Sequence, residues 1–405
     1  MTSTVVVTGM GVVAPTGIGV DEHWAATLRG TCAIDRVSRF DPTPYRSTLA
    51  AEVPGFVPEE HLPSRLIPQT DHMTRLALVA ADQALQNADL DVPSLPEFGV
   101  GVVTASSAGG FDFGHRELEK LWSKGPEHVS AYQSFAWFYA VNTGQISIRH
   151  GLRGPSGVLV TEQAGGLDAL AQARRQVRQG TRAMIGGGVD GSLCAWGWVA
   201  QQTGGRLSTA QAPDRAYLPF DAGACGQVPG EGGALLVLES ADDARARGAE
   251  VYGALLGYAA TFDPPPGSAG PSTLRRAAEL ALRDAGVEAR DIDVVFADAA
   301  GLPDLDRAEA QTLAEVFGGC AVPVTAPKTM TGRLAAGGAS LDVATALLAI
   351  RHGVIPPTVN VTRPLPDYRL DLVTRPRRAT LSAALVLARG HGGFNAAMVV
   401  GRERR

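Results

Sequence analysis

The sequence has few cysteines, and they follow no recognisable spacing. Cys32, Cys194, Cys225 and Cys320 include no CxxC pair, so they indicate neither a zinc site nor a disulfide framework, and a reducing compartment is expected. No stretch approaches the ~20 apolar residues needed to cross a bilayer. The start, MTSTVVVTGMG, lacks the basic residues and long apolar run of a signal peptide. We therefore expect a cytoplasmic protein with no membrane partner.

An excess of basic charge is also missing. The chain has 36 Lys and Arg residues against 41 Asp and Glu residues, a net charge of −5. Nucleic-acid binding generally needs a basic face, so no nucleic-acid partner is expected. Glycine (48) and proline (26) are plentiful, which favours many tight connections over a few long helices.

Short apolar runs alternate with helical patterns along the first part of the chain. The runs are bounded by glycine and rich in β-branched residues, and they predict buried strands. These strands are Val5–Thr8, Val100–Thr104, Val158–Thr161, Ala183–Gly187 and Ala234–Glu239. Helices are predicted at Thr74–Asn87 and Leu167–Gln179. This alternation predicts an α/β fold with a parallel sheet covered on both faces.

The same pattern restarts after about residue 255. A helix is predicted between the N-cap Ser272 and the stop signal Gly286, and another within Ala339–His352. Strands are predicted at Val294–Ala297, Val322–Ala326, Ala383–Ala388 and Ala396–Val400. We therefore predict two halves of similar architecture, residues 1–255 and 256–405, joined near Tyr252–Ala260.

A glycine-rich string follows the first predicted strand. TGMGVVAPTG (residues 8–17) contains the GxGxxA pattern that opens a helix in dinucleotide-binding proteins. Pro15 and Gly17 disfavour a helix here, and no strand ending in an acidic residue appears about 20 positions later. We interpret the string as a glycine turn at the end of the strand, with no nucleotide cofactor.

The stretch VLVTEQAGGLDAL (residues 158–170) has the composition of a strand, a tight bend and a helix. The residue at the bend is Gln163, near a helix N-terminus where backbone N–H groups can stabilise an anion. A thiol there would be a good nucleophile, whereas a carboxamide cannot form an acyl-enzyme. Two interpretations stay open: Gln163 fills a small polar pocket, or its amide binds a substrate.

From TGMGVVAPTG at the start to GHGGFNAAMVV at the end, the chain resembles the β-ketoacyl synthases of the thiolase superfamily. The resemblance implies an α/β thiolase-like fold of two pseudo-symmetric βαβαβαββ halves in a five-layered αβαβα arrangement. Those enzymes carry a cysteine at the bend, a histidine in an HGTGT motif, and a lysine and a second histidine in a KxxxGH segment. The corresponding residues here are Gln163, Asp298, Lys328 and Arg333, the last two in KTMTGR.

Three of these four catalytic positions are substituted, so the resemblance implies that the condensation chemistry is absent from this chain. Asp306 and Glu309 match the acidic positions that follow HGTGT. We expect Asp298 and Arg333, which replace two neighbouring histidines, to form an ion pair. This pair would close the pocket that the catalytic residues line in the enzymes of the family. Glu309 would then neutralise the retained Lys328.

Several motifs are similar to those of the chain length factor, or ketosynthase-β, of type II aromatic polyketide synthases. They are TEQAGGLDALAQARR, SFAWFYAVNTGQISIRHG, DVVFADAAG, APKTMTGR and ARGHGGFN. The resemblance implies a heterodimer with a catalytic ketosynthase-α that extends a poly-β-keto chain from malonyl units. The growing chain is carried on the phosphopantetheine arm of an acyl carrier protein, so neither a bound cofactor nor a metal ion is expected in this subunit.

In that family the polyketide lies in a tunnel at the subunit interface. The segment that resembles its gate is GGFDFGHRELEKLW, residues 109–122, with Phe111, Gly114 and Leu118 on one helical face. Bulky side chains there would end the tunnel early, so this combination predicts a product longer than an octaketide, namely a decaketide. Without the resemblance, the pattern is that of an ordinary amphipathic helix.

Two further groups of residues are candidate surfaces. SFAWFYAVN (residues 134–142) suits a dimer interface or a buried core helix, with Trp196 and Trp198 on the same surface or in the tunnel wall. The predicted interface residues are Phe135, Trp137, Phe138 and Tyr139. A predicted basic stripe, Arg174, Arg175, Arg178 and Arg182, reads as a solvated helix face or as a docking site for an acidic carrier protein.

Two alternatives to a tunnel-forming subunit remain. Gln163 could polarise a thioester carbonyl and help decarboxylate malonyl groups to supply acetyl starters, although Asp298 and Arg333 alter the donors that would stabilise an enolate. The other alternative is an active ketosynthase homodimer, which the loss of the nucleophile disfavours.

Overall fold

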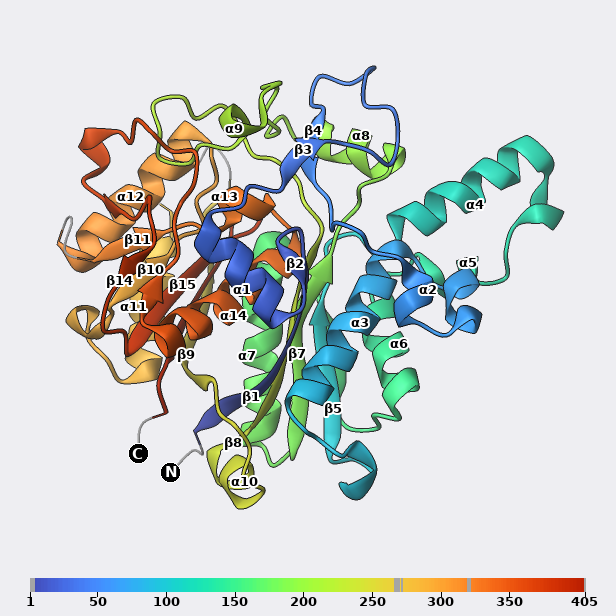
Figure 1. The fold of residues 1–405 in the computed structure, drawn as a ribbon, viewed down its shortest axis with the longest axis horizontal. Helices are drawn as coiled ribbons and strands as arrows, with labels where there is room; N and C mark the ends of the chain where they lie inside the picture. The colour runs from blue at the N-terminus through green and yellow to red at the C-terminus, as the bar shows by residue number, and fades with distance from the viewer. Residues whose placement is uncertain (1–3, 266–269, 271, 319–321, 404–405) are drawn as a thin grey trace.

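The computed structural model describes residues 4–403 except 266–269, 271 and 319–321, and Cys320 lies outside the described residues (Figure 1). Most strands belong to one 12-stranded sheet in the order β13-β11-β10-β15-β16-β9-β1-β8-β7-β5-β6, with β2 paired to β1. Two short pairs lie apart, β3 (Ile34–Arg36) with β4 (Leu49–Ala51) and β12 (Val354–Ile355) with β14 (Arg377–Arg378).

The sheet consists of two five-stranded arrangements that have the same strand order and connectivity. The first half contributes β1 (Val5–Ala14), β5 (Val100–Ala105), β6 (Ser156–Leu159), β7 (Ala183–Asp190) and β8 (Gly232–Ser240). The second contributes β9 (Gly253–Phe262), β10 (Val294–Phe296), β11 (Pro323–Thr325), β15 (Ala383–Arg389) and β16 (Phe394–Gly401). The short β2 (Gly17–Ile18) and β13 (Asp371–Leu372) are added to β1 and β11.

The strand directions match between the halves. β6, β5 and β7 run parallel, as do β11, β10 and β15, while β8 and β1 and their counterparts β16 and β9 are antiparallel. The expected parallel sheet is therefore correct for three strands of each half only. β1 and β9 join the halves at Val6↔Ala254 and Val7↔Gly253. The boundary predicted at residues 255 and 256 falls inside β9 and stays a prediction.

Helices complete the five-layered αβαβα arrangement, which confirms the thiolase-like fold. Between the halves of the sheet lie α7 (Gly165–Arg178) and α14 (Ala336–His352), which contact each other and strands of both halves. α3 (His72–Asn87) and α6 (Val141–His150) cover the outer face of the first half, and α11 (Leu274–Ala285) and α12 (Pro303–Phe317) lie outside the second (Figure 1). Residues 336–350 of α14 are all buried, as expected for a helix that is apolar all round.

The remaining helices are mostly short. They are α1 (Val20–Arg29), α2 (Pro58–His61), α4 (Phe111–Lys124), α5 (Gln133–Ala136), α8 (Ala195–Thr203), α9 (Pro213–Ala216), α10 (Ala241–Ala246) and α13 (Lys328–Thr331). Short 3₁₀ helices lie at Ser64–Gln69, Val92–Ser94, Pro126–His128, Glu162–Ala164, Ala289–Asp291 and Pro366–Tyr368. In Figure 1, α4 projects from the body of the molecule on the right.

Several strand ends differ from the sequence prediction, and β1 and β6 show why. β1 does not turn at Gly9 but continues to Ala14, because its glycines lie against α3. A Cβ on Gly11 would lie 1.8 Å from the carbonyl oxygen of Ala80, so the glycines allow helix and strand to touch. β6 ends at Leu159 rather than Thr161, since the chain turns earlier towards the bend.

In the second half, Gly286 ends α11 in the left-handed conformation (φ 63°), as predicted. Ser272 lies one residue before the N-cap, which is Thr273, and its hydroxyl accepts a hydrogen bond from the Leu274 N–H. Among the described residues, no helix has both the length and the apolar character needed to cross a membrane.

Candidate functional site

The bend at Gln163 has the expected strand–turn–helix geometry. After β6, Glu162 adopts a positive φ of 51° and Gln163 lies in the one-turn 3₁₀ helix that leads into α7. Gly165 and Gly166 allow α7 to approach its neighbours, because a Cβ on Gly166 would lie 2.6 Å from the Ser340 nitrogen. The backbone therefore presents residue 163 at the start of the central helix layer, next to α14.

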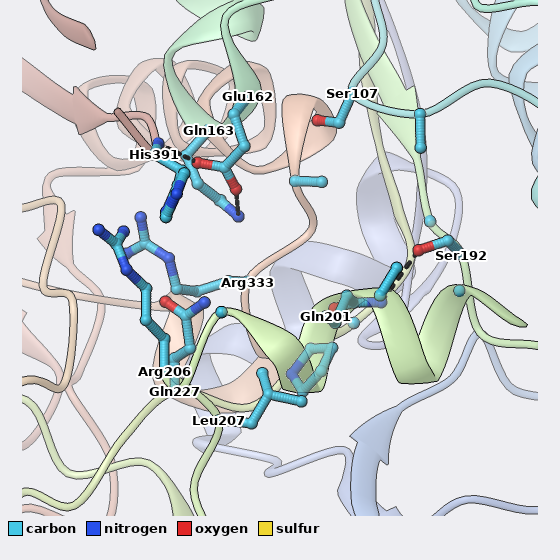
Figure 2. A pocket seen from close by; sticks show the side chains of 18 of the residues that line it. Ser107, Glu162, Gln163, Ser192, Gln201, Arg206, Leu207, Gln227, Arg333 and His391 are labelled. Atoms are coloured by element: carbon cyan, nitrogen blue, oxygen red, sulfur yellow. Dashed lines mark hydrogen bonds between the residues drawn. The ribbon is translucent and has the colours of Figure 1, made fainter. Parts of the chain in front are cut away.

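Gln163 is almost fully buried yet borders an open cavity. Its Nε2 donates to Glu162 Oε1 at 2.9 Å, and the Oε2 of that carboxylate accepts the backbone N–H of His391 at 2.8 Å (Figure 2). The cavity has a volume of about 500 Å³. Its lining includes Ser107, Phe111, Gln163, Gln201, Arg206, Arg333 and His391. Gln163 is thus both hydrogen-bonded, as the first interpretation required, and accessible from the cavity, as the second required.

Asp298 and Arg333 form the predicted ion pair. Arg333 Nη2 lies 2.9 Å from Asp298 Oδ1, and its Nη1 donates to the Asp298 carbonyl at 2.7 Å. The same carboxylate oxygen accepts the Arg389 N–H at 2.9 Å. Both side chains are at most 4% exposed. The pair therefore ties the end of β10 to the segment after α13 and to the end of β15.

The prediction that this pair closes the old pocket is wrong. The Arg333 guanidinium is held by Asp298 and by the Arg389 carbonyl, so its side chain forms part of the cavity wall without filling the space.

Charge keeps the pair ionised against the cost of burial. Burial raises the pKa of Asp298, but the positive charges of Arg333, Lys328 and Arg389 outweigh this and hold that pKa below its usual range. Burial likewise lowers the pKa of Arg333, and the Asp298 charge overcomes it, so the pKa of Arg333 lies well above its ordinary value. The two histidine positions thus hold a fixed cation and anion in place of groups that exchange protons near neutral pH.

Lys328 pairs with a different acid from the one predicted. Its Nζ lies 2.7 Å from Asp342 Oδ2 and also donates to the Ala297 carbonyl. Glu309 instead accepts the backbone N–H groups of Asp298 and Ala299 at 2.7 and 2.8 Å. The positive φ of Ala299 (49°) turns its amide towards α12, so Glu309 is occupied with the backbone and Lys328 needs another partner.

Two carboxyl groups of α12 are poised near neutrality. Burial, reinforced by the charge of Asp298, raises the pKa of Glu309 to about 7. Burial also raises the pKa of Asp306 to about 6, although the Phe220 and Gly301 N–H groups donate to it. Both acids support the loop after β10 and lie at the motif positions that the resemblance indicated.

Sequence reasoning missed Asp342, Glu162, Arg206 and His391. For Asp342 a signal was present, because one acid within the apolar helix 336–350 must be paired when buried. The others come from loops and one 3₁₀ turn whose approach to the bend depends on the tertiary fold.

The comparisons with known proteins cover nearly the whole chain. The model for the beta-ketoacyl synthase N-terminal domain matches residues 2–244, and that for the C-terminal domain matches residues 252–362. The chain belongs to the β-ketoacyl synthase family.

Within this family, the tetracenomycin polyketide synthase ketoacyl synthase beta subunit of Streptomyces glaucescens is 61% identical over 98% of both chains. The 3-oxoacyl-[acyl-carrier-protein] synthase 2 of Staphylococcus aureus is 33% identical, over 98% of this chain and 97% of its own. The predicted membership in the ketosynthase-β group is therefore confirmed.

Solved structures agree with this placement. The ishigamide ketosynthase/chain length factor superposes with a TM-score of 0.91 at 28% identity, covering 100% of both chains. The AntDE:AntF structure, a type II polyketide acyl-carrier protein in complex with its ketosynthase bound to the hexaketide, gives a TM-score of 0.88 at 25% identity, also with full coverage of both chains.

The predicted gate residues lie on α4. Phe111 borders the cavity and stacks on Trp196, with ring centroids 4.6 Å apart. A Cβ on Gly114 would lie 3.3 Å from Trp196 and 3.6 Å from the Cβ of Trp137, so Gly114 faces both indoles. Leu118 is half-buried one turn further on. The arrangement brings Phe111 and Gly114 to the same tryptophan, and the gating role of the three residues stays a prediction.

The aromatic segment 134–142 is not a buried core helix. Within the segment, residues 134–136 belong to the short helix α5, and residues 137–140 are not helical. Trp137, Phe138 and Tyr139 are 48%, 38% and 40% exposed, and Phe135 is half-buried. Trp196 is also exposed, whereas Trp198 is fully buried and donates its indole N–H to the Ser47 carbonyl. Trp198 therefore belongs to the core, and neither prediction for it is correct.

The predicted basic stripe is not one surface. Arg174 is buried and pairs with Asp284 at 2.7 Å, because α7 lies between the two halves of the sheet. Arg175 and Arg182 are exposed, Arg178 is half-buried, and Arg182 pairs with Asp243. The four residues therefore form neither a solvated face nor a common docking site.

Removing Arg333 tests the buried pair. Arg333→Ala leaves the Asp298 carboxylate without its cation, and we expect it to lower the free energy of unfolding by about 3–5 kcal/mol. The double variant Asp298→Ala/Arg333→Ala should recover part of this loss because it leaves no buried charge unpaired. Thermal or urea unfolding measures both, and a single variant as stable as the wild type would contradict the account.

Glu309 predicts a pH dependence of stability. Its folded pKa of about 7 lies above its ordinary value of 4.5, so its favourable contribution is complete below pH 4.5 and is lost as the pH rises through 7. Between about pH 5 and pH 8, the melting temperature of Glu309→Gln should therefore fall less than that of the wild type. Parallel melting curves for the two proteins across this range would refute the assignment.

Proposed function

We propose that this chain is the chain length factor of a type II polyketide synthase, a ketosynthase-β subunit that does not itself condense acyl groups. The observation that carries the proposal is the intact bend with a carboxamide at residue 163, facing an Asp298–Arg333 ion pair in place of two histidines. The 61% identity with a ketoacyl synthase beta subunit supports it. A carboxamide has no nucleophilic electron pair to form an acyl-enzyme, and an ionised pair cannot shuttle a proton.

The partner is a ketosynthase-α subunit that carries the nucleophile. Exposed Trp137, Phe138, Tyr139 and Trp196 supply the large apolar side chains that anchor subunit interfaces. The second partner is an acyl carrier protein, whose phosphopantetheine arm carries the malonyl and polyketide thioesters, so this subunit needs no cofactor of its own. The AntDE:AntF structure, which holds a carrier protein with its ketosynthase, supports this assignment. The complex would act in the cytoplasm.

The wall of the product tunnel is the contribution of this chain to the reaction. Phe111 and Gly114 lie against Trp196 and Trp137 beside the exposed aromatic surface, where a tunnel between two subunits would run. Gly114 allows Trp196 and Trp137 to lie against α4, and Leu118 is smaller than an aromatic residue. The wall therefore admits a long chain, and we propose a decaketide product.

A bulky side chain at residue 114 should shorten the product. In Gly114→Phe the new ring must displace Trp196 towards the tunnel, so co-expression with a ketosynthase-α and carrier protein should give chains at least one two-carbon unit shorter. Product masses measure the change. Arg116→Phe, at an exposed position on the opposite face of α4, is the matched control and should leave the length unchanged. An unchanged product from Gly114→Phe would refute the gate.

A second candidate function is malonyl decarboxylation. It is favoured by the open cavity, where Gln163 and Arg206 offer an amide donor and a positive charge to a malonyl thioester. We expect the purified chain to release no carbon dioxide from malonyl-carrier protein above the background rate, because Asp298 and Arg333 stand at the positions where two histidines would stabilise an enolate. Carbon dioxide that disappears in Gln163→Ala would instead establish the second function.

A further inference from the structure

One buried carboxylate outside the catalytic site connects the body of the molecule to the gate helix. Asp71 is 1% exposed and is the N-cap of α3, where its Oδ1 accepts the Met73 N–H at 2.8 Å. Its Oδ2 accepts the N–H of Phe113 at 2.7 Å. Phe113 lies in the first turn of α4, between Phe111 and Gly114. One side chain therefore caps two helices.

The start of α4 needs this external cap. Its own N-cap is Gly110, which has no side chain to accept the free N–H groups of the first turn. Gly110 also makes the approach possible, because a Cβ there would lie 3.0 Å from the Cβ of Asp71 and 2.1 Å from the Ala136 carbonyl oxygen. The positive ends of two helix dipoles thus converge on one carboxylate.

Two further hydrogen bonds of α4 lie within the segment that projects with it. Gly110 donates to the Trp137 carbonyl at 3.0 Å, and Glu117 accepts the Ser130 N–H at 2.7 Å. These bonds hold residues 109–137 to one another. Asp71 is different because it belongs to α3, which packs on β1, β7 and β8, and Figure 1 shows α4 leaving the body of the molecule beyond this point.

We propose that Asp71 is a positioning residue for chain length, which fixes α4 so that Phe111 and Gly114 keep one register against Trp196. The proposal rests on the proposed gate function of α4. With the carboxylate in place, the tunnel wall has one position and the complex releases one dominant chain length. Without it, the first turn of α4 shifts relative to Trp196, and the wall no longer defines a single end.

The Asp71 carboxylate is costly to bury. Burial raises its pKa to about 6, although the N–H groups of Phe113 and Met73 and the charge of His72 act in the opposite direction. Neighbouring Asp112 raises this pKa further. Asparagine has a similar shape and would avoid this cost, but it offers one acceptor oxygen where two N–H groups need one each.

The test compares product lengths from the full ketosynthase-α and ketosynthase-β pair with its carrier protein. In Asp71→Ala we expect the ratio of off-length chains to the main product to rise about fivefold. This is the factor that corresponds to the loss of one hydrogen bond, here the one from Phe113 of α4. Amides 111–114 should also exchange hydrogen faster. Ser240→Ala removes a cap of the same kind from α10, away from the gate, and should leave the ratio unchanged.

Three results decide the proposal. An unchanged length distribution in Asp71→Ala overturns it when Gly114→Phe does shorten the product, and so does a lower total yield at the same distribution, which shows a structural role only. If Gly114→Phe also changes nothing, the gate function itself is overturned and Asp71 with it. If Asp71→Ala does not fold, Asp71→Asn, which keeps one acceptor oxygen, is judged by the same ratio.

Discussion

The ion pair between Asp298 and Arg333 is the interaction on which the site depends. It joins the ends of β10 and β15 to the segment after α13, at the place where the two halves of the sheet and the central helices meet. Its partners are held in turn by Glu309, which accepts the Asp298 N–H, and by the neighbouring pair of Lys328 and Asp342. The result is a buried polar cluster in which Asp298 and Arg333 stay charged, at the two positions where the family motifs carry histidines.

The site has the backbone shape expected of the family but lacks its reactive side chains. The bend at Gln163, the glycines that bring α7 close to α14, and the cavity of about 500 Å³ are all present, so the backbone still shapes a substrate-sized space. What has changed is the set of groups that could attack a thioester or accept a proton from it. A subunit of this kind contributes walls and surfaces, and the exposed aromatic residues beside α4 are the surfaces available for a partner.

The sequence predicted the site better than it predicted individual contacts. Gln163, Asp298 and Arg333 were placed together by motif, and opposite charges at adjacent positions were sufficient to predict the pair. The predicted partner of Lys328 is wrong. Glu309 instead accepts the backbone N–H groups that the positive φ of Ala299 exposes, and sequence spacing does not reveal this local geometry. Gly9 and Gly11 predict a turn because glycine is common in turns. In the structure they lie within β1, where α3 packs too closely to leave room for a side chain. The burial of Arg174 depends on α7 becoming a central helix, and that of Trp198 depends on residues 37–50 packing over α8, neither of which the local sequence reveals.

We propose that this chain shapes the product while its partner carries the acyl group. Intact-mass measurement of both subunits, after the reconstituted pair has been incubated with an acyl donor on the carrier protein, tests this division of roles. We expect an added acyl mass on the ketosynthase-α subunit and none on this chain. An acyl mass on this chain that is lost in Gln163→Ala would overturn the proposal.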